Sequence, residues 1–167
     1  MFLKNERHRV YIAHAFRGPN GDAADIEAIK TNTADAIRLA WALREWLPNF
    51  IFYCPHEWDY LLQPWRAGHI TSEQILEHCC AIVRMCTHVY VLSNPEESAG
   101  VQLEMEEAMK AGVIIVELWP HIDNLRQIAE MRASVMEEIS LRHLGVINGM
   151  EATTNEQEAA NRRPGIH

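Results

Sequence analysis

Short apolar runs alternate along the chain with segments of helical periodicity, and this order constrains the fold more than any other feature. The apolar runs cover residues 10–13, 50–53, 89–92 and 114–117, and helical periodicity marks 33–47, 71–86, 100–111 and 123–144. Such alternation is typical of a parallel sheet with right-handed crossovers, and nearly continuous apolar runs indicate strands covered on both faces. We therefore predict an α/β fold of flavodoxin-like or Rossmann-like type, with four to five parallel strands flanked by helices in a single domain.

Two segments fall outside this alternation. Residues 56–70 (HEWDYLLQPWRAGHI) are irregular and aromatic-rich, which favours a loop over a pocket. Residues 151–167 contain almost no large apolar side chain, which is typical of a mobile tail. Because a chain of 167 residues suits one domain, we expect the α/β domain to cover residues 1–147 and a flexible polar tail to cover 148–167.

The charge balance argues against a general role in binding nucleic acid polymers. The formal net charge is -8, whereas neutralising a phosphate backbone requires a basic face. A local site for one anion stays compatible with this charge, because a few backbone N–H groups and one Arg can hold a phosphate.

The cysteines and the hydropathy indicate a cytoplasmic protein without a metal centre. The four cysteines show neither CxxC pairing nor the spacing of a zinc site, and three of them fit core positions (Cys54, Cys79 and Cys86). No segment approaches the length of a membrane span, and the first ten residues lack the apolar stretch of a signal peptide. We therefore expect reduced thiols and no contact with a membrane.

The segment from Ser93 to Glu104 (SNPEESAGVQLE) is the most informative for function. It runs from the end of a predicted strand through a polar turn into a helix, and ligands of parallel sheets lie beyond such strand ends. Free backbone N–H groups near Ser98 and Gly100 favour an anion, and Glu104 one turn later can lean back toward the same place. On this spacing alone, a first-turn Glu favoured by the helix dipole remains the simpler interpretation.

Two motifs that follow one another in the chain favour a functional role for Glu104 over this simpler interpretation. Residues 11–18 (YIAHAFRG) resemble the first strand and loop of the nucleoside 2-deoxyribosyltransferase-like superfamily, and residues 98–104 (SAGVQLE) resemble its Ser-x-Gly-x-x-x-Glu motif. Within the superfamily, the pattern is most similar to deoxynucleoside 5′-monophosphate N-glycosidases. The resemblance covers residues 9–119 in the order and spacing of elements.

The resemblance implies an enzyme that cleaves the N-glycosidic bond of a nucleoside 5′-monophosphate or nucleoside, without metal or organic cofactor. Glu104 would be the nucleophile that attacks the anomeric carbon, and Tyr11 would lie beside it. Ser98 would bind the phosphate together with the N–H group of Gly100. The loop after the first strand would line the substrate pocket with His14, Phe16, Arg17 and Gly18.

One departure concerns the acid of the reaction. The family usually carries an Asp on the helix before the nucleophile, and the matching position here is Cys80, a neutral thiol. Glu77 lies on roughly the same face of that helix and is a candidate substitute, although a solvated surface charge is the simpler interpretation. His14 replaces a Gly that is common in the family loop.

The sequence leaves further interpretations open. His56 and Trp58 follow the second strand, and gripping a base or packing within a loop are equally good interpretations. The resemblance also implies a homodimer or larger assembly. The main alternative to an enzyme is a non-catalytic nucleotide-binding or sensing module on the same fold. A third is a structural or interaction protein that uses the aromatic 56–65 loop as its contact surface.

Overall fold

The computed structural model describes residues 7–18 and 26–134. Residues up to Arg126 belong to one compact unit, and the described residues 127–134 of the second unit are helical. The predicted domain boundary near residue 147 and the predicted tail 148–167 lie outside the described residues. So does the part of the predicted 123–144 helix beyond residue 134.

The chain forms an α/β fold of the predicted Rossmann or flavodoxin type. Four parallel strands make one sheet in the order β2-β1-β3-β4. They are β1 Arg9–Ala13, β2 Ile51–Tyr53, β3 His88–Val91 and β4 Ile114–Glu117. The helices between them are α1 Ile26–Trp46, α2 Asp59–Arg66, α3 Ser72–Val83 and α4 Ala99–Ala111. Short 3-10 turns follow three strand ends, at Pro55–Glu57, Pro95–Glu97 and Trp119–His121.

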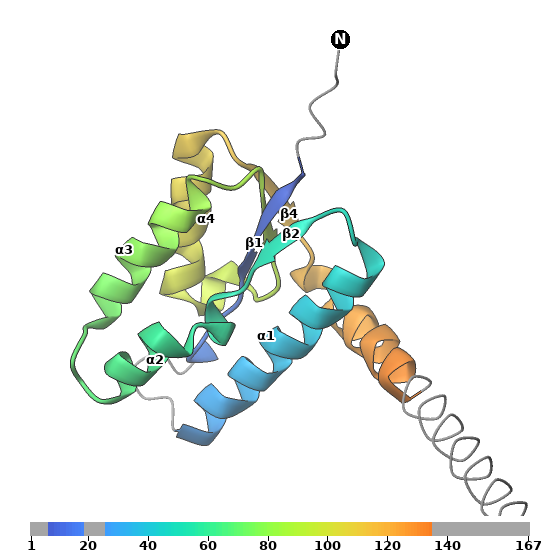
Figure 1. Ribbon diagram of the computed structural model, residues 1–167, viewed down its shortest axis with the longest axis horizontal. Coiled ribbons are helices and arrows are strands. Elements are labelled where there is room, and N and C mark those ends of the chain that lie inside the picture. Colours follow the sequence, from blue (N-terminus) through green and yellow to red (C-terminus); the bar gives the residue numbers. More distant parts are fainter. Residues whose placement is uncertain (1–6, 19–25, 135–167) are drawn as a thin grey trace, which may run out of the picture. The chain divides into compact units, whose positions relative to one another are not determined.

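Helices cover both faces of the sheet (Figure 1), and alternating side chains of β1 divide the core between these faces. Val10 and Ile12 pack on the face covered by α1, whereas Tyr11 and Ala13 pack on the face covered by α3 and α4. Residues 10–13 are fully buried because β1 lies between two neighbouring strands and beneath helices on both sides. Tyr11 is thereby directed at α3 and α4.

The helix ends agree with the local sequence. Thr71 caps α3 in a capping box with Gln74, as expected from the predicted helix start at residues 71–73. Ser98 caps α4 by accepting a hydrogen bond from the N–H group of Val101. Gly112 ends α4 in the left-handed conformation, with φ of 70°.

The prediction of an irregular loop at 56–70 is wrong for its central part. Asp59–Arg66 is helical, with Asp59 in its first turn and the side chain of Leu62 buried. Pro64 lies inside this helix and can donate no backbone hydrogen bond, which made the segment look non-helical in the sequence. Burial of one apolar face outweighs that local cost.

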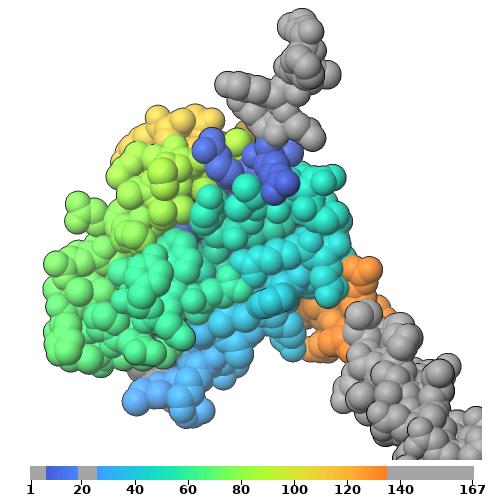
Figure 2. Space-filling model, in the orientation of Figure 1, coloured from blue at the N-terminus to red at the C-terminus, as the bar shows by residue number. Residues whose placement is uncertain are grey.

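In the space-filling view, the face turned to the reader carries α2 and α3 on the left and α1 below and to the right (Figure 2). Within residues 7–18 and 26–134, no helix combines the length and the apolarity that crossing a bilayer would require.

Candidate functional site

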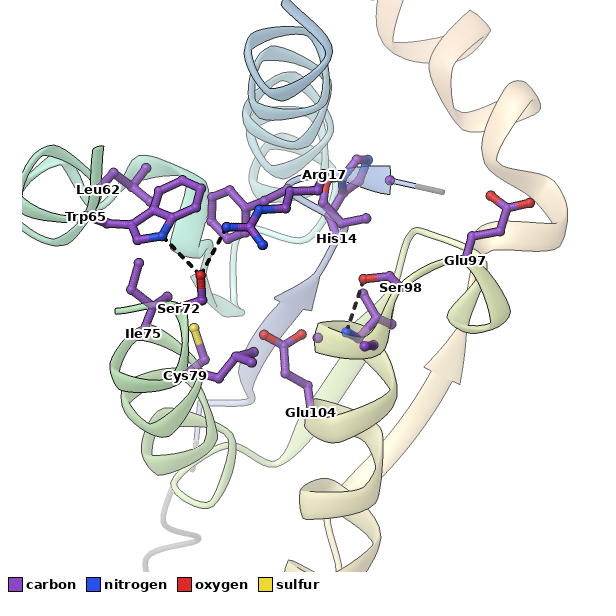
Figure 3. Close-up of a pocket in the computed structure, with 17 residues that line it drawn as sticks. His14, Arg17, Leu62, Trp65, Ser72, Ile75, Cys79, Glu97, Ser98 and Glu104 are labelled. Atoms are coloured by element: carbon purple, nitrogen blue, oxygen red, sulfur yellow. Dashed lines mark hydrogen bonds between the residues drawn. The ribbon is translucent and has the colours of Figure 1, made fainter. Parts of the chain in front are cut away.

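A cavity of about 310 Å³ opens beyond the carboxyl end of β1, next to the start of α4 (Figure 3). Its wall comes from the loop after β1, from α2 and α3, and from the chain that enters α4. The lining residues are His14, Ala15, Phe16, Arg17, Gly18, Leu62, Trp65, Ser72, Ile75, Leu76, Cys79, Glu97, Ser98, Ala99, Gly100, Val101 and Glu104. The cavity therefore lies at the sheet edge where the sequence predicted ligand binding.

Glu104 brings a buried carboxyl group to this cavity. The Tyr11 hydroxyl donates a 2.6 Å hydrogen bond to Glu104 Oε1. The side chain is only 5% exposed, and Oε2 has no hydrogen-bond partner among the described residues. In Figure 3, the carboxyl group points from α4 into the space beside Cys79 of α3. The predicted position of Glu104, in a pocket and beside Tyr11, is confirmed, while its chemical role stays a prediction.

Burial dominates the electrostatics of this pair. Removal from water raises the pKa of Glu104 to about 8, although hydrogen bonding by Tyr11 and interaction with the Cys79 thiol act in the opposite direction. Burial and the nearby Glu104 also raise the pKa of Tyr11 well above its ordinary value. The Tyr11 hydroxyl therefore keeps its proton and serves as a donor to Glu104.

The start of α4 brings a second polar group to the cavity. Ser98 lies at the N-cap and lines the site together with first-turn residues of α4, where helix N–H groups lack intrahelical partners. Gly100 follows in the first turn, and a Cβ atom built there would lie 3.3 Å from Leu76 Cδ2. Glycine at this position therefore allows close packing of α4 on α3, besides leaving backbone exposed to the cavity.

The opposite rim is held together by Ser72 at the start of α3. Its hydroxyl oxygen accepts a 3.1 Å hydrogen bond from Arg17 Nη2 and a 3.2 Å hydrogen bond from Trp65 Nε1. The Arg17 guanidinium lies over the Trp65 ring, 5.3 Å from its centroid. Gly18 ends this part of the loop with φ of 64°, a conformation that favours glycine. Three separate segments thus meet at one side of the cavity.

A buried ionic network lies behind His14. Its Nε2 atom is 3.4 Å from Asp35 Oδ2, and Asp35 accepts hydrogen bonds from Arg38 and Arg126. Burial alone would raise the pKa of Asp35, but the hydrogen bonds from His14, Arg126 and Arg38 hold it well below its ordinary value. Asp35 thereby connects the cavity wall at His14 to α1 and to Arg126.

His56 and Trp58 do not line the cavity. His56 is 2% exposed, donates its Nε2 hydrogen to the carbonyl oxygen of His14 at 3.0 Å, and stacks on Phe16. Burial lowers its pKa to about 3, so the ring is neutral. Trp58 packs beside Tyr60 and His78. Of the two interpretations that the sequence left open for these residues, the packed one describes their contacts.

Cys80, which stands at the predicted position of the acid, is not the cysteine of α3 that lines the cavity. Cys80 is half-buried and Glu77 is exposed, and neither lines the cavity, whereas Cys79 does. The buried cysteines Cys54, Cys79 and Cys86 lie in the core as expected. The signal for Cys79 was present in the sequence, because it belongs to the apolar stripe of α3 with Ile75, and that stripe faces the sheet and the cavity.

Other cavity residues were missed for different reasons. Trp65 lies in the segment predicted to be irregular, and Ser72 was treated only as part of a helix start. Asp35 was overlooked because its partner Arg126 lies 91 residues away in the sequence. In the part of the chain that the structure describes, no group of three or more His, Cys, Asp or Glu side chains is arranged to hold a metal ion.

One family model matches part of the chain that forms the site. The model of a domain of unknown function, DUF4406, matches residues 55–117, which is less than half of the chain. The matched segment runs from the end of β2 to the end of β4 and includes Ser98, Gly100 and Glu104. A search among curated proteins finds no match.

Proposed function

We propose that the protein cleaves the N-glycosidic bond of a nucleoside 5′-monophosphate or nucleoside, with Glu104 as the nucleophile. The observation that carries this proposal is the buried Glu104 carboxyl group, which accepts a hydrogen bond from Tyr11 at Oε1 and belongs to a side chain that lines the cavity. A carboxylate suits attack on an anomeric carbon because it stabilises an oxocarbenium-like centre and bonds to it covalently.

The surroundings of Glu104 suit a sugar with a small anionic group. The cavity volume lies at the lower end of the roughly 300–1,000 Å³ that is common for small-molecule sites. Ser98 and the backbone at Gly100 offer donors for a 5′-phosphate, and Arg17 adds a cation at the rim. Trp65 and Phe16 give the same cavity aromatic surface, against which a base can stack.

The residues supply a two-stage route. Glu104 bonds to the anomeric carbon as the base leaves, and Tyr11 then stays hydrogen-bonded to the ester oxygen or the carboxylate. Water, or a second base, next attacks the anomeric carbon and frees Glu104. The rim formed by Arg17, Trp65 and Ser72 restricts the access of bulk water to this intermediate.

One observation favours the alternative of a non-catalytic nucleotide-binding module. Every residue of α3 is described, and neither of its carboxylates, Glu73 and Glu77, lines the cavity. The helix instead presents the neutral Cys79 thiol, whose pKa burial raises well above its ordinary value. A site in which this helix supplies no acid can bind a nucleotide and leave it intact.

Free-base release distinguishes these two functions. We expect the full chain to release base from at least one member of a panel of ribo- and deoxynucleosides and their 5′-monophosphates. Glu104→Gln should reduce this release by roughly 10³-fold or more, because Gln keeps the shape but cannot act as the nucleophile. Glu106→Gln, on the exposed side of the same helix, is the matched control and should leave the rate unchanged.

The same panel gives the contrary outcomes. Base release that persists in Glu104→Gln would rule out Glu104 as the nucleophile. Nucleotide binding by calorimetry without any base release would instead establish the binding module. A chain that neither binds nor cleaves any member of the panel would contradict both proposals.

A further inference from the structure

The two oxygens of the Glu104 carboxyl group have different surroundings. Oε1 accepts the hydrogen bond from Tyr11, whereas Oε2 is buried and has no partner among the described residues. An ionised carboxylate here would rely on the Tyr11 hydroxyl and on the weak donor of the Cys79 thiol, and an incompletely satisfied anion is costly to bury. A hydrogen on Oε2 removes that cost and makes this atom a donor in a side chain that lines the cavity.

The charged and titratable groups around Glu104 provide no compensating cation. Each neighbouring element contributes at least one such group: Tyr11 from β1, Cys79 and Cys80 from α3, His14 and Arg17 from the first loop, and Glu97 from the turn before α4. None of these forms an ion pair with Glu104 among the described residues. Arg17 is bonded to Ser72, and His14 lies beside Asp35. Figure 3 shows the Glu97 carboxylate pointing away from Glu104.

Neither close neighbour is a suitable acid for a leaving base. Burial raises the pKa of Cys79 well above that of a free thiol. Tyr11 is fully buried, its pKa is raised, and its hydrogen is already directed at Glu104 Oε1. Burial raises the pKa of Glu104 to about 8, so this carboxyl group holds a transferable proton at neutral pH.

Resting on the proposed N-glycosidase function, we propose that Glu104 supplies both the proton and the nucleophile. Oε2 gives its hydrogen to the leaving base, and the carboxylate that remains bonds to the anomeric carbon. One carboxyl group then takes the two roles that a pair of carboxyl groups performs in most glycosidases.

The step balances in atoms and electrons. The bond between the anomeric carbon and the base nitrogen breaks, and its electron pair stays on the base. The base takes the Oε2 proton at one of its nitrogens, and a Glu104 oxygen forms the new bond to the anomeric carbon. Water then attacks that carbon, the ester bond breaks with its electron pair on Glu104, and the second proton of water returns to the carboxyl group. The enzyme ends as it began, and the sugar carries the hydroxyl group.

Infrared difference spectroscopy of the full chain tests the proton directly. At pH 6.5, we expect the C=O stretch of a protonated carboxyl group that is absent from Glu104→Gln and retained in the control Glu106→Gln. The band should disappear as the pH passes through about 8, where Glu104 ionises. A carboxylate that is already ionised at pH 6.5 would overturn the inference, whether or not the chain releases base.

The pH dependence of kcat/KM for two leaving groups tests the transfer. For the natural base, which needs a proton, we expect kcat/KM to fall about tenfold per pH unit above about 8. For the corresponding 4-nitrophenyl glycoside, which leaves as an anion, kcat/KM should rise about tenfold per unit up to about 8, because only the ionised nucleophile is then required.

The outcomes separate this inference from the proposed function. If both substrates show the same rising limb, Glu104 is a nucleophile that donates no proton, so the inference fails and the N-glycosidase proposal stands. If neither substrate is cleaved under any condition, the N-glycosidase proposal fails and proton delivery fails with it. Opposite slopes, together with the infrared band, support both.

Discussion

The protonation of the buried Glu104 side chain affects both its proposed chemistry and the stability of the folded chain. Its carboxyl group lies in the apolar wall between α3 and α4, with a single hydrogen bond from Tyr11. A folded-state pKa of about 8, against an ordinary value of 4.5, means that the folded chain binds a proton that the unfolded chain has lost at neutral pH. The free energy of unfolding therefore falls as the pH rises between these two values.

This residue-scale argument predicts a stabilising substitution. Glu104→Gln removes the titration, so its stability relative to the wild type should increase by roughly 2–4 kcal/mol between pH 5 and pH 8. Urea denaturation at the two pH values measures the difference, with Glu106→Gln as control. A stability difference that does not change with pH would show that Glu104 is ionised in the folded state throughout this range.

Between elements, Asp35 is the group that joins distant parts of the chain. It lies on α1 and accepts hydrogen bonds from Arg38 of the same helix and from Arg126. It also lies beside His14 of the cavity wall. A depressed pKa means that its stabilising contribution is complete above about pH 4 and is lost as the pH falls below the ordinary value of 3.8.

Asp35→Asn should therefore destabilise the chain at neutral pH. We expect a loss of roughly 1–3 kcal/mol, limited by the partial exposure of both Arg side chains to water. The loss should shrink as the pH falls below about 4, because the unfolded wild type then takes up a proton at Asp35 that the folded chain does not, which already lowers the stability of the wild type. Denaturant titrations at pH 7 and pH 3.5 measure it. An equal loss at both values would attribute the effect to packing instead of charge.

For the whole molecule, the exposed apolar side chains support the predicted homodimer. Large apolar side chains are exposed at Met85 after α3, at Leu103 and Met109 of α4, and at Ile114 of β4. We propose that a second copy covers part of this surface. Light scattering at micromolar concentration should give the mass of a dimer or larger assembly, and Met109→Glu should reduce it. A monomeric mass for the wild type would contradict the proposal.

The order of the elements and the place of the site could be predicted from local patterns in the sequence. Apolar runs fix strands by local patterning, and a polar turn that leads into a helix fixes where backbone donors are exposed, so Ser98, Gly100 and Glu104 could be placed without coordinates. These features depend on neighbours within a few residues, which the sequence shows directly. The place of Tyr11 beside Glu104 was predicted only from the resemblance of residues 11–18 to a family motif.

Features that depend on tertiary packing could be known only from the folded structure. Cys79 and Cys80 are adjacent, yet only the rotation of α3 against the sheet determines which of them lines the cavity. The helix at Asp59–Arg66 forms despite Pro64 because its apolar face is buried, and that brings Trp65 to Ser72 and Arg17. The contact of Asp35 with Arg126 joins residues that no local pattern relates. Local spacing sets the period of a helix, whereas its orientation and its distant partners follow from how the core closes.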